Sequence, residues 1–173
     1  RKAVRWLAAV PYLRIVFGSG SLAMNNTDDK SDLDVLIVVK AGRIWTARFL
    51  TTALLSILRV RRRKGESIAP DKICLNHYIT DKSLRIPFES LYNAQTYRHL
   101  VPILEIRTKL FGILDLTEEF YEVNEWIKKY IWNWPLSKSD FNSFKKIKPN
   151  IFLLKISGLA EKILNTKAGD LLE

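Results

Sequence analysis

The chain has 173 residues, of which 47% are hydrophobic and 27% charged; this composition excludes wholesale disorder and suits one domain with an appendage, or two small domains. The net charge of +10 is concentrated in residues 1–87, which hold 16 Lys/Arg against 7 Asp/Glu. Such a basic half favours an anionic partner, a nucleotide or a nucleic acid, although a solvated basic surface has the same composition.

Cysteine usage and hydropathy bear on the compartment. Cys74 is the only cysteine, which excludes an internal disulfide and a cysteine-rich zinc site and favours a reducing cytoplasm. Residues 44–58 are mostly apolar, but they are shorter than the roughly 20 residues of a spanning helix, and Arg48 interrupts them. We therefore expect a cytoplasmic protein without membrane insertion. Because the chain starts at Arg1 rather than at Met, we also expect a fragment of a longer protein, or a chain with its ends missing.

The first half of the chain alternates between helical and strand patterns. In chain order we expect a short helix over 2–10, a buried strand over 13–17, a strand over 33–39, a helix over 43–63 and a strand over 72–80. The segment 33–39 (LDVLIVV) is the clearest strand, because its β-branched and nearly continuous apolar run is typical of a central strand covered on both faces.

The second half is mainly helical in pattern. We expect helices over 89–99, 117–134 and 151–166, an ambiguous stretch over 100–116 and a polar linker over 136–150. Thr117 is the expected N-cap of the second of these helices, which Pro135 ends. In the last helix, the residues expected to face a core are Ile156, Leu159, Ile163 and Leu164.

These elements predict an α/β (α+β) protein. A small mixed sheet covered by helices would span residues 1–87, and a helical region, packed on this core or following it, would span residues 88–173.

Two carboxylates stand at the start of the central strand. Alternate residues of a strand point to the same face, so Asp32 and Asp34 should project together, about 6–7 Å apart at Cα. Like charges so placed repel each other, and a divalent cation removes that cost. Two carboxylates, with waters and substrate phosphate oxygens completing an octahedron, describe a typical Mg²⁺ site.

A glycine-serine turn precedes the carboxylates by about a dozen residues. Gly18 lets a phosphate approach the main chain closely, and the hydroxyl groups of Ser19 and Ser21 can donate hydrogen bonds to it. A phosphate cradle beside a metal pair supplies the positioning and charge neutralisation that phosphoryl-type transfer needs. The turn is not a P-loop, because no Gly-Lys-Ser/Thr follows, and the acids of TDDKSDLD lack the glycine and glutamate of an EF-hand.

The segment FGSGSLAMNNTDDKSDLDVLIVV resembles the signature of the polymerase-beta-like nucleotidyltransferase superfamily: hydrophobic strand, Gly-Ser, spacer and Asp-x-Asp. GRIWTAR at 42–48, DKICLN at 71–76 and FYEVNEWIKKYIWNW at 120–134 resemble a group of uncharacterised bacterial proteins with this domain. The resemblance implies that Gly18 and Ser19 hold the triphosphate of an NTP such as ATP, while Asp32 and Asp34 bind two Mg²⁺ ions. An acceptor hydroxyl would attack the α-phosphate and release pyrophosphate.

The chain departs from the family pattern at one position. Many members carry a third carboxylate on a later strand, but the matching strand over 72–80 has no acid. Asn76 is the candidate for this third position, and Asp71 stands at the start of the strand. A catalytically silent nucleotide-binding or regulatory module, and a nucleic-acid-binding module, therefore remain alternatives to the enzyme. The sequence names neither the acceptor nor the oligomeric state.

Structural roles are expected for three further features. Cys74 is interpreted as a small core residue, and strand alternation predicts that His77 faces away from Asn76. The basic run over 59–64 is interpreted as a charged helix end that suits the helix dipole, with contact to a nucleic-acid backbone as the alternative.

Overall fold

The computed structural model describes residues 2–20, 32–63, 65–66, 69–70, 72–106, 116–130 and 147–165. The elements in chain order are the 3-10 helix η1 (Lys2–Ala9), β1 (Leu13–Gly18), β2 (Leu33–Val39), α2 (Ile44–Ile57), β3 (Ile73–Thr80), α3 (Leu91–Tyr97), β4 (Val101–Glu105), α4 (Leu116–Val123), α5 (Trp126–Lys129) and α7 (Ile151–Leu164).

The strands form one four-stranded mixed sheet in the order β3-β2-β1-β4. β2 runs parallel to β3 and antiparallel to β1, which in turn is antiparallel to β4. Every residue of β2 except Asp34 is buried, as its apolar sequence predicts for a central strand. The fold is therefore a mixed α/β architecture, as expected.

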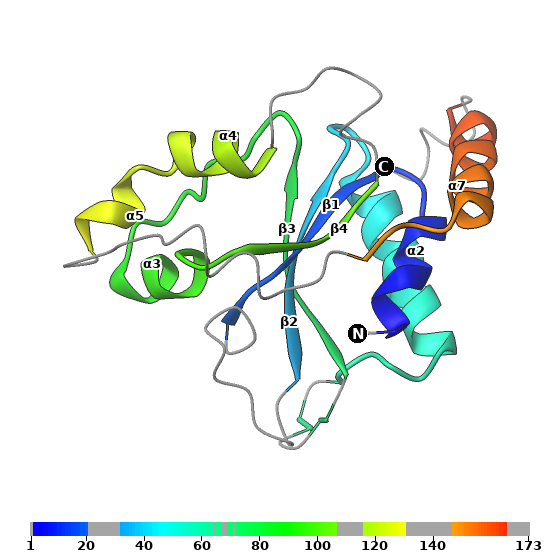
Figure 1. Ribbon diagram of the computed structural model, residues 1–173, viewed down its shortest axis with the longest axis horizontal. Helices are drawn as coiled ribbons and strands as arrows, with labels where there is room; N and C mark the ends of the chain where they lie inside the picture. Colours follow the sequence, from blue (N-terminus) through cyan, green and yellow to red (C-terminus); the bar gives the residue numbers. More distant parts are fainter. Residues whose placement is uncertain are drawn as a thin grey trace.

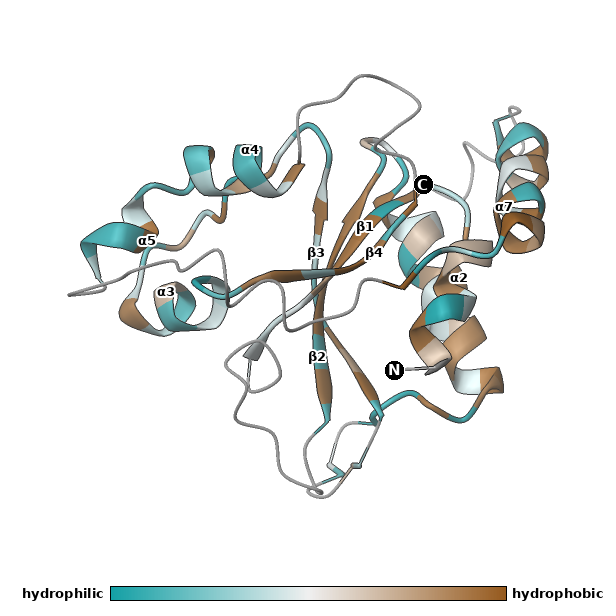
Figure 2. Cartoon of the chain, in the orientation of Figure 1, coloured by the Kyte–Doolittle hydropathy of each residue, from teal (hydrophilic) through white to brown (hydrophobic). Residues whose placement is uncertain are grey.

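Helices cover both faces of the sheet (Figure 1). On one face, Val35 and Ile37 of β2 pack in a cluster with residues of η1, α2 and α7, among them Leu55. On the other face, Leu36 and Val38 of β2 pack with residues of α3, α4 and α5. Figure 2 shows the consequence: the strands are largely brown, whereas the helices alternate between brown and teal. Alternation along β2 thus supplies two cores.

β4 lies in the stretch over 100–116, which the sequence left ambiguous. It is an edge strand of five residues that pairs with β1, and a single parallel bridge joins its Leu104 to Ile147. Its second residue is Pro102, which lacks the N–H of a regular ladder and is tolerated on an edge. The sheet therefore draws a strand from the second half of the chain.

Helix α2 ends at Ile57, so the helix predicted over 43–63 was too long. Arg59 adopts a left-handed backbone with φ 57°, which no helix can continue. Two backbone bonds close the end in the manner of a Schellman motif: Arg59 N donates to Ser56 O at 3.1 Å, and Val60 N donates to Leu55 O at 3.0 Å. Glycine is the usual residue at such a position, so the sequence carried no stop signal. Within the described part of the chain, no helix is long and apolar enough to cross a bilayer.

The helix predicted over 117–134 is also interrupted. α4 ends at Val123 and α5 starts at Trp126, with Asn124 buried between them, while Thr117 lies inside α4 rather than capping it. The Asn124 side chain makes four bonds: it accepts from Ile86 N (2.8 Å) and Trp126 Nε1 (3.1 Å), and it donates to Leu84 O (2.9 Å) and Phe120 O (2.8 Å). A polar side chain that satisfies four buried groups outweighs one more turn of helix.

Replacing Asn124 with alanine should destabilise the protein by about 3 kcal/mol, because several buried polar groups would lose their partner. Urea unfolding of the variant measures this loss. The matched control is Asn150→Ala, which removes the exposed N-cap bond to Phe152 N and should cost about 1 kcal/mol. Equal losses in the two variants would contradict the structural role of the buried amide.

Helix α7 buries a different face from the one predicted. Leu153, Ser157 and Glu161 face the protein, whereas Ile156, Leu159 and Ile163, expected in a core, are 41–62% exposed. Of the four residues expected in a core, Leu164 does pack against it. Glu161 Oε1 accepts from Tyr12 N at 2.8 Å and Ser157 Oγ donates to Val10 O at 3.2 Å. These bonds satisfy backbone groups at the bend between η1 and β1, which would be costly to leave unpaired, and so they decide the orientation of the helix.

Candidate metal and nucleotide site

Two carboxylates meet at the start of β2. Asp32 immediately precedes the strand and Asp34 lies within it, so alternation points both to one face. One ligand atom from each, together with Cys74 Sγ of the neighbouring β3, lies within 4.8 Å of the others. All three side chains are half-buried, open to solvent on one side. The convergence expected of the two aspartates is thus present.

β3 contributes two side chains to this cluster. Cys74 is the ladder partner of Asp34, and Asn76 donates from Nδ2 to Asp34 Oδ1 at 2.6 Å. Cys74 Sγ in turn donates to Asn76 Oδ1 at 2.9 Å. Asn76 therefore stands where the third ligand was expected, but it turns its amide nitrogen, not its carbonyl, to the carboxylate. The interpretation of Cys74 as a core residue was wrong, since it belongs to the site.

Burial and charge shape the protonation of the cluster. Burial, reinforced by the charge of Asp32, raises the pKa of Asp34 above its ordinary value. Burial and then the charges of Asp34 and Asp32 raise the pKa of Cys74 to about 11. The Cys74 thiol is therefore neutral at neutral pH, and a site of carboxyl oxygens beside a neutral thiol fits a hard, oxygen-ligated cation such as Mg²⁺ better than a thiolate-bound zinc.

An arginine from the basic run reaches the same site. Arg62 Nη1 lies 2.6 Å from Asp32 Oδ2, and the remainder of the guanidinium donates to the backbone oxygen of Glu66 at 3.1 and 3.3 Å. The bond and charge of Asp32 raise the pKa of Arg62 further above its ordinary value. The basic run is therefore more than a charged helix end, since one member offsets a charge of the carboxylate pair.

The glycine-serine turn packs directly against Asp34. Gly18 pairs with Val35 at the end of β1, and Ser19 N donates to the backbone oxygen of Asp34 at 2.9 Å. Gly20 has φ 61°, and a Cβ there would lie 2.5 Å from Asp34 Oδ2. The turn therefore lies beside the carboxylates, as the motif predicts. The backbone N–H of the buried Ser19 is already bonded to Asp34, so a phosphate would have to be bound by N–H groups that follow Ser19 in the turn. Ser21 lies outside the described residues.

A β-bulge changes which way His77 points. In the β2–β3 ladder Val35 pairs with Leu75, but Leu36 pairs with His77, so Asn76 is the extra residue. Asn76 bonds Asp34, and His77 Nδ1 lies 2.6 Å from the hydroxyl of Tyr97 on α3. Both side chains are thus on the face that carries Asp34, and the prediction that His77 faces away from Asn76 was wrong. Burial lowers the pKa of His77, as expected of a neutral structural histidine.

Cys74 and Asn76 are two residues apart on one strand and so share a face, which would have identified Cys74 as a neighbour of the site. No comparable signal marks Arg62, whose position depends on the turn after α2. Asp71, the other acid considered for the third position, lies outside the described residues. Comparison of the chain with protein-family models, with curated proteins and with solved structures gave no significant match.

Proposed function

We propose that the protein is an Mg²⁺-dependent nucleotidyltransferase with a polymerase-beta-like core, which transfers a nucleoside monophosphate from an NTP to an acceptor hydroxyl. The single observation that carries this proposal is the packing of the Gly18–Gly20 turn against Asp34, beside Asp32, at the solvent-open end of β2. A phosphate-binding turn and a pair of metal-binding carboxylates are the two parts such a reaction needs.

Each part has a defined task in this proposal. Asp32 and Asp34 would hold Mg²⁺, which when bound neutralises phosphate charge. The Gly18–Gly20 turn would keep the triphosphate against the carboxylates. The acceptor oxygen forms a bond to the α-phosphorus while the bond to the β-phosphate oxygen breaks, and pyrophosphate leaves. Arg62, one contact from Asp32, is placed to offset the negative charge that accumulates there.

A catalytically silent nucleotide-binding module is the second candidate, and Asn76 is the observation in its favour. Its amide nitrogen faces Asp34, and an amide cannot accept the proton of an acceptor hydroxyl. In the enzyme, this proton would pass to solvent. The two candidates therefore differ in turnover and not in binding.

Pyrophosphate release tests the enzyme against the silent module. With Mg²⁺, each of the common NTPs and a panel of hydroxyl acceptors, we expect release that Asp32→Ala lowers by more than about 100-fold, since a metal ligand contributes several kcal/mol. The control Glu122→Gln removes an exposed carboxylate on α4 and should retain activity. Saturable NTP binding without turnover in every acceptor mixture would reject the enzyme and support the module.

A further inference from the structure

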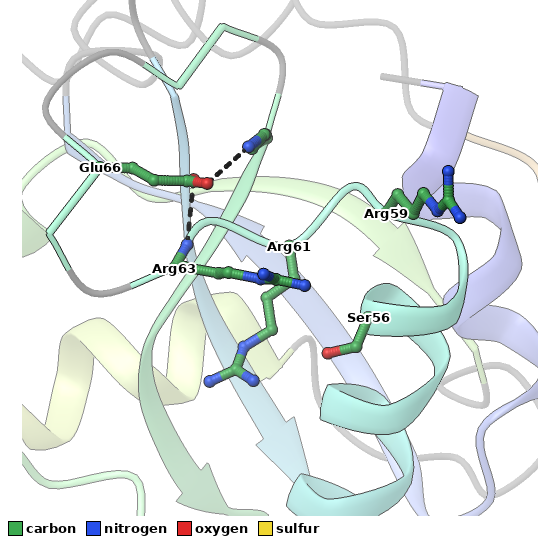
Figure 3. Close-up of a pocket in the computed structure, with 6 residues that line it drawn as sticks. Ser56, Arg59, Arg61, Arg63 and Glu66 are labelled. Carbon is green, nitrogen blue, oxygen red and sulfur yellow. Dashed lines mark hydrogen bonds and ion pairs between the residues drawn. The ribbon is translucent and has the colours of Figure 1, made fainter.

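A basic pocket lies where the chain leaves α2 and passes β3 (Figure 3). It has a volume of about 210 Å³, and its lining residues are Ser56, Arg59, Arg61, Arg63, Glu66 and Lys72. Four of these six carry a positive charge, whereas only Glu66 is negative. The pocket is therefore an anion site by composition.

The single acid does not neutralise the arginines. Glu66 Oε1 lies 2.8 Å from Lys72 Nζ, and its other oxygen accepts from the backbone N–H of Arg63 at 3.1 Å. Within the described residues, the guanidinium groups of Arg59, Arg61 and Arg63 have no carboxylate partner. Four cationic side chains against one carboxylate leave the pocket with a net positive charge, which phosphate groups would offset.

Arg59 combines a left-handed backbone with a place in the lining of the pocket. Arg59 is held at φ 57° at the end of α2, in the position where glycine is the residue with the lowest cost. An arginine there strains the backbone without improving the helix end. Arg59 belongs to the lining of the pocket, but its guanidinium points away from those of Arg61 and Arg63 in Figure 3.

The pocket and the carboxylate site are joined by one short segment. Ile73 N donates to Val60 O at 2.7 Å, and Arg62 N donates to Ile73 O at 2.9 Å, so this segment extends beside β3. Side chains alternate along such a segment. Arg62 consequently reaches Asp32, whereas Arg61 and Arg63 line the pocket on the other side. A ligand that contacts both the basic pocket and the carboxylate site must therefore extend from one side of this segment to the other.

We propose that the pocket binds backbone phosphates of a single-stranded nucleic acid, and that this nucleic acid is the acceptor. The role of the nucleic acid as acceptor rests on the proposed transferase function. A phosphodiester chain supplies phosphates on both sides of the segment, which a compact phosphorylated molecule does not. Arginine pairs with phosphate in a bidentate manner, and this contact is independent of base sequence.

Fluorescence anisotropy with a labelled single-stranded RNA of about 20 nucleotides, longer than most single-strand sites, tests the binding. The variant Arg61→Gln/Arg63→Gln should bind about 10-fold more weakly than the wild type. The slope of log affinity against log salt should fall by roughly 1.4, since each lost phosphate contact removes about 0.7. The control Lys128→Gln/Lys129→Gln makes the same charge change on the exposed side of α5 and should leave both quantities near wild type.

A second variant separates binding from folding. Arg59→Gly relieves the left-handed strain, so its Tm should rise while its RNA affinity falls. Equal affinities and slopes in the pocket variant and the α5 control would overturn the proposal, and so would the absence of RNA binding by the wild type.

Binding is measured without NTP or Mg²⁺, so its outcome does not depend on the transferase reaction. RNA binding through the pocket without pyrophosphate release would reject the transferase reaction but support the pocket as a nucleic-acid site. Pyrophosphate release with a small acceptor, in a protein that does not bind RNA, would reject the nucleic-acid acceptor and keep the transferase.

Discussion

The Asp34→Asn variant is expected to unfold at a higher temperature than the wild type in the absence of metal, and to have lost pyrophosphate release. The pKa of Asp34 is raised in the folded protein, first by burial and then by the charge of Asp32. The folded state therefore binds this proton more tightly than the unfolded chain does. The stabilisation that it gives is fully present below the unfolded pKa of 3.8 and is lost as the pH rises through the folded value.

Burial and the charge of Asp32 make the ionised form of Asp34 less favourable in the folded protein, and asparagine removes this cost. Its side chain can still accept the bond from Asn76, and it no longer repels Asp32. We expect a gain on the order of 1 kcal/mol, as is common when a residue kept for function is replaced. Thermal unfolding in EDTA at pH 7 measures it, with Asp81→Asn as the control. Asp81 holds Arg14 and the N–H of Ala41, so its replacement should lower the Tm.

With magnesium present, the wild type rather than Asp34→Asn should have the higher Tm. A cation that binds only the folded state stabilises it by mass action, so the Tm of the wild type should rise with Mg²⁺ concentration while that of Asp34→Asn stays constant. A wild-type Tm that Mg²⁺ leaves unchanged would show that the carboxylate pair is not a metal site.

The sequence predicts those features of the fold that follow from one local pattern. β2 was predicted with its observed bounds, because its apolar run leaves no other state open. β4 was missed, because a five-residue edge strand with Pro102 has neither length nor alternation. The end of α2 was misplaced, because its stop is Arg59 in a left-handed conformation and not a glycine. The buried face of α7 depends on backbone groups near Tyr12, about 150 residues away, which no local pattern reports.

In the candidate site, too, the residues that follow from a local pattern were predicted, whereas those placed by contacts between distant segments were not. Asp32 and Asp34 follow from alternation along one strand, and the turn at Gly18 follows from the motif. Arg62 could not be predicted, because it reaches Asp32 through a turn and a short edge pairing that the sequence does not announce. The parts that depend on contacts between distant segments were those that sequence reasoning left out or assigned to structural roles.

Replacing Gly20 with alanine should reduce metal binding and pyrophosphate release by about 100-fold while the protein remains folded. The new Cβ would lie 2.5 Å from Asp34 Oδ2 and 3.2 Å from its Cγ, so the carboxylate must move. Displacing a positioned group by about 1 Å is enough for such a loss. The positive φ of 61° adds a backbone cost of about 1–2 kcal/mol. Activity assays, Mg²⁺-dependent Tm shifts and urea unfolding measure the two effects separately.

Gly42→Ala is the matched control, because it isolates the backbone cost. Gly42 has φ 70°, close to that of Gly20, but a Cβ there meets nothing within 4 Å. Both variants should therefore lose about 1–2 kcal/mol of stability, and only Gly20→Ala should lose Mg²⁺ binding and turnover. Equal activities in the two variants would show that the turn does not position Asp34, and the observation that carries the proposed function would then be without consequence for the chemistry.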